Sequence, residues 1–256
     1  YTEGKANGKG SESMAEIQPI RQKWKGTMTD RDRFNAQMHY RPIDRTFHME
    51  FGYWDENFTE WEMFRKNGIR SNDPPFPYQV VEETADTRII MNGDGLLAEV
   101  PRDAHDTIPH FLKATVCTPD DWKRVKAERF RPEGRVIDVE ALKKAHPADR
   151  DYPLGVDVGS MIGKIRDMLT FEGLCYAMYD YPAMVEDMVE TCCVLVEQTL
   201  DQLLPHFDFD FASGWEDICF KNGPIVTPAF FRDVVMPRYK RIHQKLKAHG
   251  VDIWYM

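Results

Sequence analysis

Cysteine is scarce in this chain, which has 256 residues and only five thiols. The count is odd and no CxxC or CxH spacing occurs, so neither a disulfide framework nor a zinc knuckle is indicated. Reduced thiols are the simplest interpretation. The five are Cys117, Cys175, Cys192, Cys193 and Cys219.

Two further absences narrow the class of partner. No apolar run approaches the roughly 20 residues that a membrane span needs, and the first residues carry no hydrophobic signal segment. Cations are not in excess either, because the formal net charge is −9 and the acids are spread along the chain. This charge works against nucleic acid or an anionic membrane as a partner. We therefore expect a cytoplasmic protein that binds a small molecule.

The composition is that of one globular domain with an unstructured start. Hydrophobic residues make up 42% of the chain and charged residues 29%, which suffices for one sizeable core. Residues 1–28 are rich in Gly, Ser, Lys and Glu without an apolar period, so we expect a disordered extension or an expression remnant there. Residues 29–256 would form the N-terminal and central part of a single domain. The Asn-Gly-Asp-Gly turn between two apolar arms predicts a β-hairpin insertion near 88–101.

Strand and helix patterns alternate in the second half of the chain. The stretch "YPLGVDVGS" (152–160) is typical of a buried strand, and residues 183–204 show the three- and four-residue steps of an amphipathic helix. A strand pattern at 207–215 and a helix pattern at 227–250 follow, with Pro237 expected to kink that helix. This alternation predicts parallel βα units, as in a doubly wound sheet or a (β/α)₈ barrel. No GxGxxG follows a strand, which disfavours a dinucleotide-binding sheet.

Several separated segments resemble the uroporphyrinogen decarboxylase superfamily in order and approximate spacing. That superfamily also holds the corrinoid-linked methyltransferases that act on methanol, methylamines, methylthiols and aryl methyl ethers. The resemblance covers roughly Thr29 to Met256 and implies a (β/α)₈ TIM barrel, with about five of the eight βα units present in this chain and the active site at the carboxyl ends of the strands. The segments are "DRDRFNAQMHYRPIDR", "GKIRDMLTFEGLCYAMYDYPAMVEDMV", "GWEDICFKNGPIVTPAFFRDVVMPRYKRIHQKLKAHG" and "VDIWYM".

The same resemblance suggests cofactors and partners. In the methyltransferase branch the strand matching "VDIWYM" leads into a His-x-Cys zinc pair, so zinc ligands would lie beyond Met256 and no metal ligand is assigned to the residues present. A corrinoid cofactor or corrinoid protein and a homodimer are also implied. The decarboxylase proper carries an arginine signature, "MRQAGR", near its first strand, where this chain has "HMEFGYW".

That difference favours a methyltransferase or an O/N-demethylase that acts on a small methylated compound. Two alternatives stay open: a lyase that decarboxylates a carboxylated substrate, and a non-catalytic binding subunit.

On the barrel interpretation, acids from separate strands meet at one mouth. Carboxylates that share a low-dielectric cleft repel, so at least one has a raised pKa and can act as a general acid or base. The predicted catalytic acids are Glu216, Asp217 and Asp157. The predicted substrate-binding residues are His48, Glu50, Tyr53, Trp215, Lys221 and Arg166.

Each of these residues also has a structural interpretation. Glu216 and Asp217 would then only form local hydrogen bonds at a strand-to-loop turn, and Asp157 would be a buried partner of Arg166. His48 is more typical of a core or rim histidine than of a ligand, because no second ligand has the usual spacing.

Overall fold

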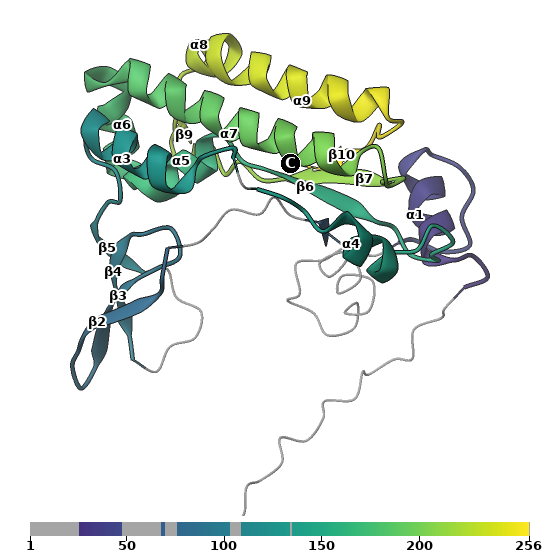
Figure 1. Ribbon diagram of the computed structural model, residues 1–256, viewed down its shortest axis with the longest axis horizontal. Coiled ribbons are helices and arrows are strands. Elements are labelled where there is room, and N and C mark those ends of the chain that lie inside the picture. The colour runs from purple at the N-terminus through teal and green to yellow at the C-terminus, as the bar shows by residue number, and fades with distance from the viewer. Residues whose placement is uncertain (1–25, 48–67, 70–75, 103–108, 134, 256) are drawn as a thin grey trace, which may run out of the picture.

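The computed structural model describes residues 26–47, 68–69, 76–102, 109–133 and 135–255. They form an α/β body and a separate antiparallel sheet that extends from it (Figure 1). The predicted extension 1–28 lies almost entirely outside the described residues. None of the described helices combines the length and apolar character needed to cross a lipid bilayer.

Sheet A, in the body, has four strands in the order β1-β6-β7-β10, and every neighbouring pair is parallel. The strands are β1 (Gly68–Ile69), β6 (Gly155–Gly159), β7 (Phe211–Gly214) and β10 (Trp254–Tyr255). Sheet B is antiparallel in the order β2-β3-β4-β5. Its strands are β2 (Gln79–Glu83), β3 (Thr87–Met91), β4 (Leu97–Pro101) and β5 (His110–Lys113).

The predicted (β/α)₈ TIM barrel, with about five of its eight units, is wrong. In the described part of the chain sheet A is an open sheet of four parallel strands, and its first and last strands are not neighbours. Residues 79–113 supply four antiparallel strands rather than a βα unit. The prediction failed because alternating strand and helix patterns occur in open parallel sheets as well as in barrels, and the pattern does not report closure.

A layer of helices covers one face of sheet A. Val156, Val158 and Ala212 point into this layer and are fully buried in one core cluster with residues of α7. Figure 1 shows α7 and α9 lying side by side above the sheet. The helices are α3 (Pro119–Arg129), α4 (Val139–Ala145), α5 (Ile162–Leu169), α6 (Phe171–Asp180), α7 (Pro182–Leu203) and α9 (Met236–Ala248).

The helix that contains Pro237 stays continuous through a change of helix type. Thr227 caps its start, and α8 (Pro228–Phe230) leads into a π-helical turn, η2 (Phe231–Val235), before α9 begins. Proline lacks the N–H that would bond four residues back, and its ring clashes with that carbonyl. A π turn widens the backbone just before the proline. The sequence predicts a kink at Pro237, and the structure has this π turn directly before it.

Helix α1 (Asp30–Met38) packs on the other face of sheet A. Its Phe34 is fully buried between the rings of Phe47 and Phe211, at centroid distances of 5.4 and 5.2 Å. Gly155 is the neighbour of Phe211 in the sheet, and a Cβ there would lie 1.9 Å from the phenyl ring. Only glycine therefore allows this ring to lie flat against β6.

A buried carboxylate also joins α1 to the sheet. Asp210 accepts hydrogen bonds from Arg31 Nε and Asn35 Nδ2, both at 2.8 Å, and from Arg150 and the Leu154 amide, both at 2.9 Å. The Arg150 side chain is only 2% exposed. Asp210 therefore links α1, the segment before β6 and the segment before β7.

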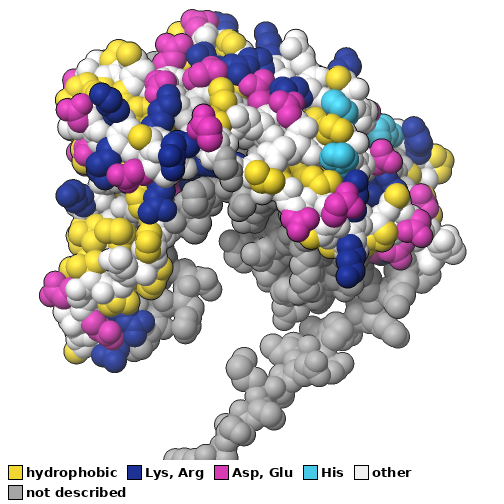
Figure 2. Space-filling view, in the orientation of Figure 1, with side chains coloured by type: hydrophobic (Ala, Val, Ile, Leu, Met, Phe, Trp, Pro, Cys, Tyr) yellow, Lys and Arg dark blue, Asp and Glu magenta, His cyan; other side chains and the backbone are white. Residues whose placement is uncertain are grey.

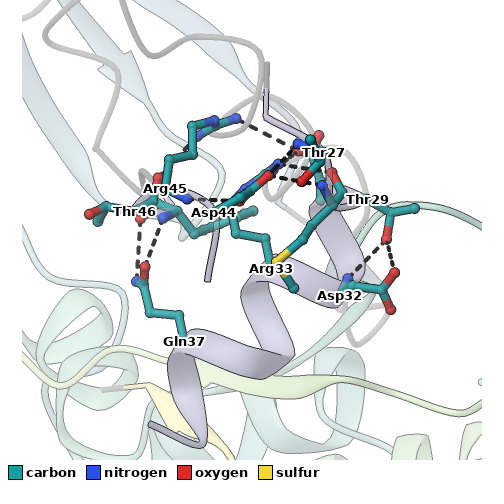
Figure 3. A network of polar contacts seen from close by, with 11 residues as sticks. Thr27, Thr29, Asp32, Arg33, Gln37, Asp44, Arg45 and Thr46 are labelled. Atoms are coloured by element: carbon teal, nitrogen blue, oxygen red, sulfur yellow. Dashed lines mark hydrogen bonds and ion pairs between the residues drawn. The ribbon is translucent and has the colours of Figure 1, made fainter. Parts of the chain in front are cut away.

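The chain on both sides of α1 is held by a second network (Figure 3). The Arg33 guanidinium, which is fully buried, donates to Asp44 at 2.7 Å, to Asp30 at 2.6 Å and to the Met28 carbonyl at 2.8 Å. Asp44 also accepts from the backbone amides of Thr27 and Met28. These donors, Arg33 first, hold the pKa of Asp44 well below its usual range.

His39, at the end of α1, gives this packing a dependence on pH. Its ring bonds to the Asn35 carbonyl at 2.7 Å and to Asp252, just before β10, at 3.0 Å, and both contacts raise its pKa above 6.5. The stabilisation is complete below pH 6.5 and is lost as the pH rises through the raised folded-state pKa. We expect His39→Gln to lower the free energy of unfolding at about pH 5.5 but not at about pH 9, as measured by urea unfolding. An equal loss of unfolding free energy at both pH values would contradict this prediction.

Candidate functional site

The carboxyl ends of β6 and β7 lie side by side. Asp157 pairs in register with Ser213 and Gly159 with Gly214, and the Trp215 amide donates to the Gly159 carbonyl at 3.2 Å. In open α/β sheets ligands bind just outside the carboxyl ends of the parallel strands. We therefore take this edge as the candidate site. Asp157, Trp215, Glu216 and Asp217, all predicted site residues, lie along it.

Glu216 is buried against the first turn of α5. Its carboxylate accepts the amide N–H groups of Met161 at 2.7 Å, Ile162 at 2.9 Å and Gly163 at 3.0 Å. It also accepts the hydroxyls of Ser160 and Tyr239. Helix α5 has no side-chain cap of its own, so Glu216 supplies acceptors for the amides that every helix start leaves unbonded.

Burial raises the pKa of the Glu216 carboxyl, while the same amides and Ser160 act in the opposite direction. Both oxygens of the Glu216 carboxylate thus already accept hydrogen bonds. The geometry makes Glu216 the element that positions α5, and any direct contact of Glu216 with a substrate would compete with this cap.

Asp217 and Arg166 form an ion pair on the surface of the same edge. Arg166 Nη1 lies 2.9 Å from both the carboxylate and the carbonyl oxygen of Asp217, and its guanidinium lies over the Trp215 ring at 5.9 Å from the centroid. Asp217 has a φ of 39°, which is unusual for a residue other than glycine. Arg166 also approaches Asp167 at 3.6 Å. The charge of Arg166 is therefore balanced by acids of the chain.

Asp157 has a different environment. Neighbouring Val156 and Val158 point into the helical layer, so Asp157 points to the opposite face, together with Ser213 and Tyr255, which are its successive neighbours across the sheet. Its Oδ1 accepts the Gly159 amide at 2.7 Å, and the side chain is half-buried. Arg166 pairs with Asp217, and no ion pair between Arg166 and Asp157 is recorded.

The other predicted residues are placed as follows. Lys221 is exposed in the turn between β8 (Cys219–Phe220) and β9 (Gly223–Pro224), a two-stranded hairpin just after the edge. His48, Glu50 and Tyr53 lie outside the described residues. The structure therefore places five predicted residues along one edge, with Asp157 on the sheet face opposite the start of α5 that Glu216 caps; the five are Asp157, Trp215, Glu216, Asp217 and Arg166.

Sequence reasoning missed three residues at this edge. Ser160 and Tyr239 hold the Glu216 carboxylate, and Ser213 accompanies Asp157. Tyr239 occupies the apolar stripe of α9 with Ile242 and Leu246, and a tyrosine in a buried stripe needs a partner for its hydroxyl. That rule would have signalled a polar group opposite Tyr239 but not which one.

The described part of the chain has no clustered set of metal ligands, and its two adjacent cysteines are buried in a helix. No group of three or more His, Cys, Asp or Glu side chains there is arranged to hold a metal ion. Cys192 and Cys193 are buried in α7, and burial raises the pKa of Cys193 to about 12. The thiolate, which is the reactive form, is thereby suppressed at Cys193.

Comparison with protein-family models, with curated proteins and with solved structures finds no match to this chain. The resemblance to the uroporphyrinogen decarboxylase superfamily therefore depends on the quoted sequence segments alone.

Proposed function

We propose that this chain is an enzyme that removes a methyl group from a small neutral or cationic compound at the carboxyl edge of sheet A. The observation that supports the proposal best is the position of Asp157. It is a half-buried acid at the end of an inner strand, on the sheet face opposite the helical layer and beside Ser213. The sequence resemblance is the reason for choosing methyl transfer among the reactions that an acid can assist.

Methyl transfer from oxygen or nitrogen needs a proton on the leaving group. The methyl carbon moves to a nucleophilic acceptor, and the electron pair of the broken bond stays on the leaving atom. Asp157, in its acid form, would donate its proton to that atom as the bond breaks. The Trp215 ring, held by Arg166 and packed on Gly163, lies at the same edge on the side of α5.

The wider context of the proposal comes from the resemblance. It implies a corrinoid cofactor or a corrinoid protein as the methyl acceptor, and a homodimer. A cytoplasmic location is proposed from the sequence itself. The resemblance also implies zinc. The described residues provide no ligand set for zinc.

Decarboxylation of a carboxylated substrate is less well supported by this edge. Such a substrate needs cationic partners, and Arg166 is already paired with Asp217. Lys221 is the other predicted cation, and it is exposed on the β8–β9 turn.

Asp157→Asn tests the proposal. Asparagine keeps an oxygen for the Gly159 amide but has no proton to donate at neutral pH, so we expect kcat to fall by about 100-fold with little change in the melting temperature. The assay follows methyl transfer from a methoxy, methylamine or methylthiol compound to a reduced corrinoid, using the full chain.

Asp149→Asn is the matched control, because Asp149 is an exposed acid before β6. We expect it to leave both rate and stability unchanged. Absence of methyl transfer by the wild-type protein with every compound class, or unchanged turnover in Asp157→Asn, would refute the proposal.

A further inference from the structure

A second site lies between sheet B and α3, away from the carboxyl edge of sheet A. A cleft of about 530 Å³ separates them, within the usual size range of small-molecule sites. Figure 2 shows basic side chains gathered where sheet B meets the helical body. Apolar residues on the sheet side of the cleft are Phe76, Pro77, Met91, Leu97 and Ala114.

The amphipathic pattern of α3 explains the polar wall of the cleft. Trp122 and Val125 are buried in the core, which turns the stripe of Asp121, Arg124 and Glu128 toward the cleft. These three residues are spaced by three and four, so they share one side of the helix. The helix thus contributes packing on one side and charge on the other.

The charges of the cleft favour an anion. Asp121 is occupied by the capping box of α3, where it accepts from the Cys117 amide at 3.2 Å and from the Thr118 amide and hydroxyl at 3.1 and 2.9 Å. Lys113, at the end of β5, forms no ion pair within the described residues. Arg124 lies on the opposite wall and donates to Asp121 Oδ1 at 3.4 Å, the oxygen that the capping box leaves open, and Arg129 adds a third cation to the lining. Two exposed cations therefore flank an apolar floor.

The floor also suits a flat ring. The Arg129 guanidinium lies 4.6 Å from the centroid of the Phe76 ring, so a planar cation already stacks on an aromatic group at the cleft wall. Met91 offers a polarisable side chain of the kind that packs well on aromatic ligands. Glu128 is the one acid of the α3 stripe outside the capping box, and it would repel an anion at its own end of the cleft.

We propose that this cleft binds an aromatic carboxylate, with the ring on the Phe76 and Met91 side and the carboxylate toward Lys113 and Arg124. The site is independent of the function proposed for the edge of sheet A. Cys117 lines the cleft and is exposed, which provides a chemical reporter at the site itself. Cys219, on β8, is exposed and does not line the cleft.

The test combines calorimetry with thiol labelling of the full chain, using 2-naphthoate as the probe. At about ten times the Kd of the probe, iodoacetamide should label Cys117 about tenfold more slowly, because the free fraction of the site falls as 1/(1 + [L]/Kd). Labelling of Cys219, located by peptide mass mapping, should not change. The uncharged 2-naphthamide should bind about tenfold more weakly, as expected for a lost charge-assisted contact.

Matched variants separate the cations of the cleft from general charge. Lys113→Met combined with Arg124→Gln should weaken binding of 2-naphthoate at least about tenfold, whereas Lys123→Met, on an exposed part of α3 outside the cleft, should not. All three positions are exposed, so circular dichroism should show an unchanged fold. The proposal is overturned if 2-naphthoate does not bind, if it binds without protecting Cys117, if the amide binds equally well, or if the double variant binds like the wild type.

Discussion

Asp210→Ala is expected to lower the free energy of unfolding by about 3–5 kcal/mol, the usual cost of leaving a buried charge without its partner. The carboxylate is surrounded by Arg31, Asn35, Arg150 and the Leu154 amide. Arg150 has a side chain that is only 2% exposed and would keep its charge with no acid beside it. Urea unfolding at neutral pH measures the loss.

The pH dependence of the same substitution has a defined sign. Burial alone would raise the pKa of Asp210, but the bonds from Leu154, Arg31 and Asn35 outweigh it and lower the pKa. A lowered acid pKa stabilises the fold above the ordinary value of 3.8, and that stabilisation disappears as the pH falls through the folded-state pKa. The difference between wild type and Asp210→Ala should therefore shrink in acid.

Asp208→Ala is the control for this experiment. Asp208 lies two residues earlier and its side chain is exposed, while its backbone carbonyl, which accepts from Arg150, is unaffected by the change. We expect a loss below about 0.5 kcal/mol. Equal losses in the two variants would show that the network around Asp210 contributes nothing specific.

Glu216→Gln is expected to lower the free energy of unfolding by about 2–3 kcal/mol, because glutamine replaces one acceptor oxygen with an amino group that faces donor N–H groups. The amides of Met161, Ile162 and Gly163 then lose part of their cap. A neutral side chain saves some desolvation, since burial raises the pKa of Glu216. The number of donors around the carboxylate makes the lost bonds the larger effect.

Measuring stability and turnover together separates two roles for Glu216. If Glu216 acts only as a cap, the activity of Glu216→Gln should fall only in proportion to the loss of folded protein. Tyr239→Phe, which removes one of the donors, should then lower the free energy of unfolding by about 1 kcal/mol. The sequence-based prediction of a catalytic Glu216 requires turnover to collapse while the melting temperature holds. An unchanged stability in Glu216→Gln would contradict the capping role.

Local structure followed from local patterns in the sequence. Thr29, Thr118 and Thr227 each accept an amide at a helix start, which is a common role of threonine at an N-cap. The apolar stretch around Val156 forms an inner parallel strand. These features depend on residues a few positions apart, so they can be read directly from the sequence.

The closure of the sheet could not be predicted in this way. Whether parallel strands form a barrel or an open sheet depends on pairings between segments far apart in the chain, such as Trp254 with Ala212. Sheet B shows the same limit. Its central turn at Asn92–Gly95 has a clear signal, but the outer strands β2 and β5 find their partners only through tertiary packing.

The candidate site was predictable in position but not in role. The sequence places Asp157 and Glu216 near the ends of strands, and the two strands are adjacent and parallel. It does not show that the start of α5 faces Glu216, because that depends on how a helix from one βα unit packs against the loop of the next. A carboxylate expected to be available for chemistry therefore proved to be surrounded by donors.

The π-helical turn at Phe231–Val235 determines which side of α9 faces the core. An α-helix advances about 100° per residue and a π turn advances less, so rewinding these five residues as ordinary α-helix, with none removed, would swivel α9 by roughly the advance of one residue. Tyr239 would then turn away from Glu216, and Ile242 and Leu246 would leave the interior for water. The π-helical turn thus absorbs one additional residue and keeps the far end of the helix in register with the loop after β7.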